Sequence, residues 1–68
     1  MIPYYRKAIK INPTNPWIYQ SLGELLSIKG EWDEAAVCFQ KAIDLQGINS
    51  HLWFYRNLGE ALQARPSL

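Results

Sequence analysis

The sequence predicts an all-α chain made of antiparallel helix pairs, and an internal repeat is the main reason. The segment 17–26, WIYQSLGELL, returns as 53–62, WFYRNLGEAL, at an offset of 36 residues. The segment 5–11, YRKAIKI, returns as 39–45, FQKAIDL, at an offset of 34. Repeats of this length are typical of stacked supersecondary units. No segment alternates with the two-residue period of a strand.

Large and small residues also alternate in the way that closely packed helices require, since one helix must leave room for a side chain of the other. The small residues are Gly23, Ala35 and Ala42, and the large ones are Tyr19, Trp32 and Phe39. A glycine inside a helix costs roughly 1 kcal/mol relative to alanine. Its presence at two equivalent places, Gly23 and Gly59, therefore indicates a packing requirement.

Helices are expected over residues 3–11, 16–29, 31–45 and 50–64, the middle two as an antiparallel hairpin. The helix 16–29 should begin with Asn15 as N-cap and Pro16 at the first helical position, where the missing amide is no loss. It should end at Gly30, since glycine adopts the left-handed conformation of a helix stop.

The two remaining boundaries follow from charge and from proline. Glu31, Asp33 and Glu34 place negative charge on the first turn of the helix 31–45, where it is favourable. Either Asn49 or Ser50 should cap the last helix. That helix should end near Ala64 or Arg65, because Pro66 disfavours helical geometry in the residue before it.

The spacing resembles that of the tetratricopeptide repeat family, whose pattern has an aromatic, Leu-Gly, a bulky residue, then Ala, Phe and Ala. The residues at those places are Tyr19, Leu22, Gly23, Leu26, Ala35, Phe39 and Ala42. The run 30–35, GEWDEA, is similar to the family's turn into its second helix, while Gly47 replaces the closing proline. The resemblance implies a tetratricopeptide-type α-solenoid within one domain, 1–68, with a half repeat 1–15, a full repeat 16–49 and a half repeat 50–65. We expect a piece of a longer array, the alternative being a small natural protein of four helices.

The composition argues against several classes of function. Cys38 is the single cysteine and His51 the single histidine, so neither a disulfide nor a zinc site is expected. With a formal net charge of +1, the chain lacks the excess of basic residues that binding to nucleic acid or to an anionic membrane surface would require. No apolar run approaches the length of a membrane span, and no signal peptide opens the chain. A cytoplasmic location is the default expectation.

An enzyme is not expected, and neither is a cofactor or a catalytic residue. His51 stands beside Ser50 at the start of a helix, where capping or solvent contact explains it better than catalysis. Glu24 and Glu60 are equivalent residues and could approach as a carboxylate pair, as in retaining glycosidases. Two exposed glutamates on a helix-lined surface are the simpler interpretation.

The resemblance also implies a binding surface, because the first helices of such repeats line a concave groove for a peptide or a helix. The residues at the groove positions are Trp17, Gln20, Glu24 and Ser27, then Trp53, Arg56, Glu60 and Gln63, with Asn57 beside them. Asn57 matches an asparagine of the family's peptide-clamping members, but Gln20, Glu24 and Trp53 replace the other clamp residues. A carboxylate-terminated chaperone tail is therefore an unexpected ligand. Trp17 and Trp53 could anchor a partner or could instead cover Pro13 or Ile48.

Three functions remain open. The leading prediction is a protein–protein interaction module or scaffold segment; the alternatives are an accessory or dimerisation region of a larger enzyme, such as a transferase, and a self-assembly element. Self-assembly is predicted because the first and last helices lack the partner helix that a complete repeat would provide. The residues expected to meet a second copy, in a homodimer or small oligomer, are Tyr5, Ile9, Phe54, Leu58 and Leu62.

Overall fold

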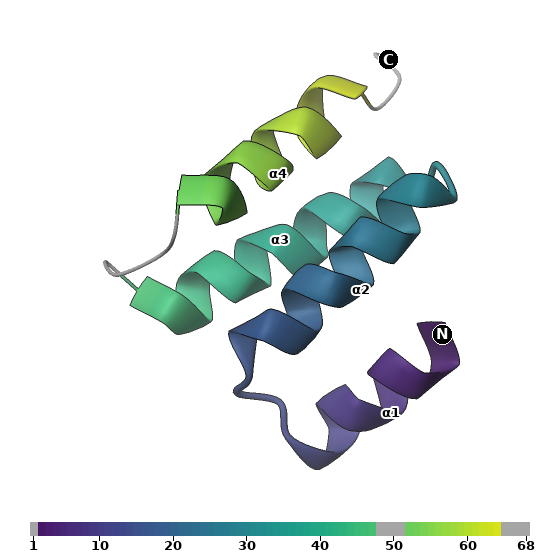
Figure 1. Ribbon diagram of the computed structural model, residues 1–68, viewed down its shortest axis with the longest axis vertical. Coiled ribbons are helices and arrows are strands. Elements are labelled where there is room, and N and C mark those ends of the chain that lie inside the picture. The colour runs from purple at the N-terminus through teal and green to yellow at the C-terminus, as the bar shows by residue number, and fades with distance from the viewer. Residues whose placement is uncertain (1, 48–51, 65–68) are drawn as a thin grey trace.

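The computed structural model describes residues 2–47 and 52–64. They form four helices, α1 (Ile2–Ile11), α2 (Pro16–Ile28), α3 (Trp32–Gln46) and α4 (Leu52–Ala64). The helices lie side by side in chain order, α3 in contact with both α2 and α4, and α1 against α2 (Figure 1). The described residues contain no strand. The all-α prediction is confirmed. Apart from the start of α4, each helix boundary lies within one residue of the expected one. The expected start of α4, at residue 50, lies outside the described part of the chain.

The start of α2 follows from its capping residue. Asn15 has an extended backbone, and its Oδ1 accepts a hydrogen bond of 3.0 Å from the N–H of Trp17. Pro16 occupies the first helical position, where no amide is needed. Both predictions for this end of the helix are confirmed.

The end of α2 depends on a backbone conformation that glycine adopts without strain. Gly30 has φ 81°, and its N–H donates to the carbonyl of Ser27 at 3.0 Å. The next amide, that of Glu31, donates to the carbonyl of Leu26 at 2.9 Å. This pair of bonds is the Schellman arrangement, which satisfies carbonyls that a helix end would leave open. The predicted stop at Gly30 is therefore confirmed.

Helix α3 starts with acidic residues in its first turn, Asp33 and Glu34, as predicted. Glu31 is the N-cap residue, and its side chain makes no capping hydrogen bond. The helix ends at Gln46, and Gly47 is its C-cap residue, with φ 72°. The capping residues expected for α4, Asn49 or Ser50, lie outside the described residues, as does Arg65.

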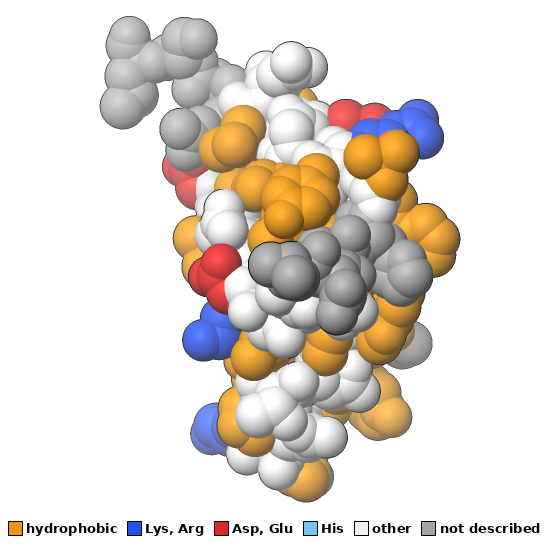
Figure 2. Space-filling view, turned by 90° about the vertical axis from the view of Figure 1, so that its left-hand side faces the viewer, with side chains coloured by type: hydrophobic (Ala, Val, Ile, Leu, Met, Phe, Trp, Pro, Cys, Tyr) orange, Lys and Arg blue, Asp and Glu red, His pale blue; other side chains and the backbone are white. Residues whose placement is uncertain are grey.

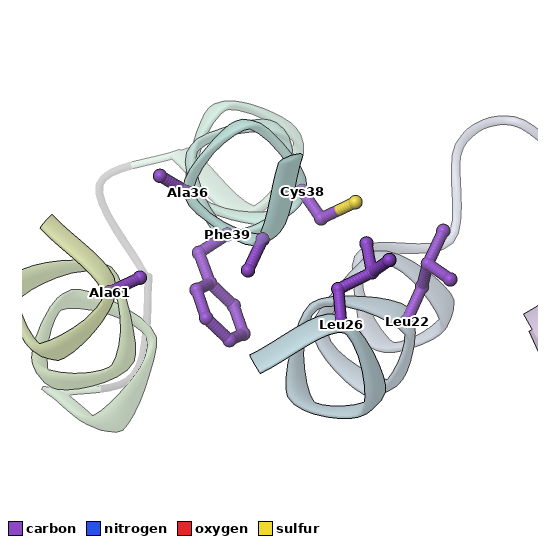
Figure 3. Close-up of a cluster of buried hydrophobic side chains, with 7 residues drawn as sticks. Leu22, Leu26, Ala36, Cys38, Phe39 and Ala61 are labelled. Atoms are coloured by element: carbon purple, nitrogen blue, oxygen red, sulfur yellow. The ribbon is translucent and has the colours of Figure 1, made fainter. Parts of the chain in front are cut away.

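The close contact of α2 and α3 is built on Gly23 and Phe39. A Cβ atom added to Gly23 would lie 2.5 Å from Cε1 of Phe39, far inside van der Waals contact. The Phe39 ring leaves α3 toward the space between α2 and α4, with Leu26 on one side and Ala61 on the other (Figure 3). The predicted packing role of Gly23 is confirmed. At Gly59 a Cβ would meet nothing within 4 Å, so the equivalent glycine has no such role among the described residues.

Helix α4 is attached to α3 by a second cluster, in which Phe54 is 0% exposed and packs with Ala42 and Ile43. Helix α1 contributes no buried residue. It rests on the core through the half-buried Tyr5 and Ile9.

These contacts correct part of the expectation for self-assembly. Phe54 is fully buried within its own chain, and Leu58, Tyr5 and Ile9 are half-buried against the two clusters. The reason is that α3 offers a second side to α4, and the α2–α3 core covers part of α1. Among the five residues only Leu62 is exposed, at 43%.

Candidate functional site

Two adjoining hollows lie between α2 and α4. The first, which we call the tryptophan hollow, has a volume of about 400 Å³ and is lined by Trp17, Gln20, Ser21, Glu24, Trp53, Arg56, Asn57 and Glu60. The second, which we call the phenylalanine hollow, has a volume of about 350 Å³ and is lined by Glu24, Ser27, Ile28, Trp32, Phe39, Asn57, Glu60 and Ala61. The two share Glu24, Asn57 and Glu60, and together we call them the groove.

The packing of α3 explains why the groove is open. Helix α3 contacts both α2 and α4, whereas these two helices touch each other only slightly. Phe39 of α3 reaches between them and forms part of the floor of the phenylalanine hollow. The side chains of α2 and α4 above that floor are therefore not buried against one another.

The two tryptophans form one end of the groove. Their ring centroids are 5.6 Å apart in an edge-to-face arrangement, and the ring of Trp17 lies 5.0 Å from that of Phe54. Trp17 nevertheless remains 42% exposed and Trp53 51% exposed. Figure 2 shows hydrophobic side chains open to solvent on one side of the molecule, with charged side chains at the margins. The tryptophans thus cover each other in part and still present apolar surface.

Gln20 is the one buried polar side chain among the described residues, at 3% exposure. Its Oε1 atom accepts no hydrogen bond from any described group. A buried acceptor without a donor costs about 1–3 kcal/mol. Gln20 lines the tryptophan hollow, but its Oε1 atom lies beneath the surface of that hollow.

Three charged side chains line the groove. Arg56 Nε lies 3.2 Å from Oε1 of Glu60, one helical turn away, and both side chains are well exposed. Exposed pairs of this kind contribute little to stability. Glu24 makes no ion pair or hydrogen bond with the described residues, although it lines both hollows.

The structure brings together eight of the nine residues predicted for the groove, all except Gln63, which is exposed on α4 outside both hollows. The prediction missed Ser21, although it stands four residues after Trp17 and so on the same helical face. It also missed the floor, in which Phe39 and Trp32 were assigned to packing alone.

The described residues meet neither the requirements of a metal site nor those of a membrane-spanning helix. Residues 2–47 and 52–64 contain no group of three or more His, Cys, Asp or Glu side chains that could hold a metal ion. No helix within these residues combines the length and apolar character needed to cross a membrane.

Antiparallel helices stacked in chain order, with a groove between alternate members, define the chain as a helical-repeat protein. Residues 4–36 match the family model described as tetratricopeptide repeat. The predicted resemblance is thus confirmed for this segment. No curated protein matches the chain.

The matched segment covers most of α1, all of α2 and the first turn of α3. It therefore spans the predicted border between residues 15 and 16, and the division into 1–15, 16–49 and 50–65 stays a prediction. Proteins of this family typically mediate protein–protein interactions.

Proposed function

We propose that the chain is a protein–protein interaction module whose groove, between α2 and α4, binds a peptide or a helix of a partner protein. The observation that carries the proposal is the open lining, to which both helices contribute exposed aromatic and polar side chains. Large aromatics supply most of the binding energy in many interfaces. Trp17 and Trp53 offer that surface, while the half-buried Asn57 offers hydrogen-bonding groups for a peptide backbone.

A selected peptide would test the proposal. We would select peptides on the intact chain from a random phage-displayed library and add each one to isotope-labelled protein for NMR titration. The amides and side chains of Gln20, Glu24, Asn57 and Glu60 should shift. Shifts confined to the outer side of α3, at Gln40 and Asp44, would show that the groove is not the binding surface.

A matched pair of variants strengthens this test. Asn57→Ala removes an amide that lines both hollows and should weaken binding by about tenfold, which corresponds to about 1.4 kcal/mol. Gln40→Ala removes an exposed amide whose described contact is a hydrogen bond to Asp44, and it should leave the affinity unchanged. Equal effects of the two substitutions would contradict the assignment.

The proposal also holds that the chain is not itself an enzyme; service as an accessory region of a larger enzyme remains the alternative. Glu24 and Glu60 are exposed, and Glu60 is paired with Arg56. Exposed glutamates are common on helix surfaces, because glutamate is a good helix former. Hydrolysis of aryl glycosides by the wild-type chain, lost in Glu24→Gln, would contradict this part of the proposal.

One observation favours self-association as a second function, and we propose that α1 of one copy docks on α4 of another. Gly59 is equivalent to Gly23 by the repeat offset of 36 residues, and Tyr5 is equivalent to Phe39 by the offset of 34. The ring of Phe39 fills the space beside Gly23, whereas the space beside Gly59 is open. Tyr5 of a second copy could fill it, in contact with Leu62, once an exchange of helices has moved its ring from the core of its own chain. A closed exchange of helices between two copies would limit the assembly to a dimer, since open stacking runs on into filaments.

Sedimentation equilibrium from micromolar to millimolar concentrations tests this second function. The wild-type chain should associate, and Gly59→Leu should remain monomeric because its side chain occupies the open space. Gln40→Leu adds an apolar group to the outer side of α3 and should associate as the wild type does. A wild-type monomer at millimolar concentration would overturn the proposal.

A further inference from the structure

The phenylalanine hollow combines an apolar floor with an acidic rim. Its apolar lining consists of Trp32, Phe39, Ala61 and the exposed Ile28. The carboxylates of Glu24 and Glu60 also line it, and no lysine or arginine among the described residues does so. The tryptophan hollow differs, since Arg56 lines it together with the same two glutamates.

The carboxylate of Glu24 stands out among the acidic side chains near the core. Glu34 pairs with Arg6. Glu31 Oε2 lies 3.9 Å from Lys29 Nζ. Asp44 Oδ1 accepts a hydrogen bond of 3.0 Å from Gln40 Nε2. In contrast, Glu24 has no partner in the described part of the chain.

The second carboxylate, that of Glu60, is held only by an exposed partner. Its contact is with Arg56, whose side chain is 76% exposed, and such a pair is easily exchanged. The hollow therefore presents two carboxylates to whatever enters it. A ligand carboxylate would be repelled there, whereas a cation would be attracted.

The shape and the charge together select a particular kind of side chain. Lysine and arginine carry a long aliphatic stem that covers apolar surface and a charged end that reaches polar groups. In this hollow the stem would lie over Phe39 and Ala61, and the charged end would meet Glu24 and Glu60. A shorter charged side chain would leave the apolar surface uncovered, and a neutral side chain would leave the carboxylates without a cation.

We infer that the phenylalanine hollow receives a lysine or arginine side chain of the partner peptide. The inference rests on the proposed function of the groove and specifies the chemistry of its ligand. The groove then offers two carboxylate acceptors to a cationic segment.

The test uses the peptides selected from the random library. Those that bind in the groove should contain lysine or arginine. Replacing that residue by norleucine, which keeps the aliphatic stem and removes the charge, should weaken binding at least about tenfold. The loss should shrink as salt is added, because salt screens interactions between charges at the surface.

Protein variants locate the effect. Glu24→Gln with Glu60→Gln should weaken binding of the basic peptide at least about tenfold and leave the norleucine peptide unaffected. The control is Glu31→Gln with Asp44→Asn, which removes the same charge from residues that line neither hollow, and it should leave both affinities unchanged. Arg56→Gln frees Glu60 and should raise the affinity for the basic peptide severalfold.

The outcomes separate this inference from the proposed function. Peptides that shift groove resonances but lack basic residues, or that tolerate norleucine, would overturn the inference and leave the peptide-binding function standing. Peptides that shift no groove resonance would overturn both. If circular dichroism shows that the doubly substituted glutamate variant does not fold, the norleucine comparison on the wild-type chain decides.

Discussion

Gly23 and Gly59 occupy equivalent places in the two echoing segments, yet their surroundings differ. The Phe39 ring lies directly against Gly23, and nothing lies within 4 Å of a Cβ placed on Gly59. Neither glycine has a positive φ, so backbone strain plays no part at these positions. The two positions therefore differ only in the space that is available to an added side chain.

We expect Gly23→Leu to lower the free energy of unfolding by at least about 2 kcal/mol, since overpacking forces the backbones of α2 and α3 apart. Gly59→Leu should be neutral or should stabilise by up to about 1 kcal/mol through helix propensity. Thermal melts at low protein concentration measure both. Glu24→Ala, at an exposed groove position, serves as the control and should change little. Equal losses for the two glycine variants would refute the assigned contact.

Cys38 is a second residue whose chemistry follows from its place in the core. It is 7% exposed, and burial raises the pKa of its thiol to about 11, with the nearby charge of Glu34 adding to the shift. A thiol held neutral in this way reacts slowly, because the thiolate is the nucleophile. Cys38 is part of the hydrophobic core.

The raised pKa of Cys38 has a consequence at alkaline pH. Below the ordinary pKa of about 9.0 the thiol is neutral in both the folded and the unfolded state. Between that value and about 11 the unfolded chain loses the proton while the folded chain keeps it, so stability falls as pH rises. Cys38→Ala should therefore show a shallower loss of unfolding free energy across this window in urea titrations. Val37→Ala, at an exposed neighbouring position, should keep the wild-type slope; identical slopes for all three chains would contradict the burial effect.

At the scale of the helix, the ends of α2 depend on two local signals that act without tertiary contacts. Asn15 supplies a side-chain acceptor at the start, and Gly30 adopts a left-handed backbone at the end. Both residues are recognisable in the sequence because capping depends on neighbours within a few positions. The register of α2 is set from both ends for this reason, and the residues predicted to share one face of the helix line the same groove.

We expect Asn15→Ala to cost about 1 kcal/mol of unfolding free energy, because the N–H of Trp17 loses its acceptor. Thr14→Ala is the matched control. The Thr14 hydroxyl bonds only to Asn12, outside the helix, among the described contacts. Urea unfolding followed by circular dichroism measures the difference. A larger effect at Thr14 than at Asn15 would show that α2 is not capped in this way.

At the scale of the molecule, stability is concentrated in the α2–α3 hairpin. Leu26, Ala35 and Ala42 are fully buried there, while α1 has no buried residue. Besides half-buried apolar side chains, α1 is joined to α3 by the exposed ion pair of Arg6 and Glu34. Local opening should therefore start at α1, since regions with few buried contacts open at the lowest free energy.

Amide hydrogen exchange should show this order directly. The slowest amides should be those of Leu26, Phe39 and Ala42, and the amides of α1 should exchange faster. Ile9→Ala should speed exchange in α1 more than in the hairpin, because Ile9 is one of the few side chains by which α1 rests on the core. Equal protection of α1 and α3 would mean that the four helices open as one unit.

The sequence by itself determined the helices, both ends of α2, the role of Gly23 and most of the residues that line the groove. These features depend on the helical period and on neighbours a few residues apart, and the internal repeat places two copies of the same face in register. Trp17 and Trp53 were recognisable as groove residues for that reason.

Only the tertiary structure decided that the two tryptophans touch each other, that Phe54 is buried, that Gly59 faces open space and that the Oε1 atom of Gln20 lacks a donor. Each of these facts depends on where one helix lies relative to another and on which rotamer a side chain adopts there. Spacing along the chain carries no information on either, because residues far apart in sequence meet only after the helices have packed.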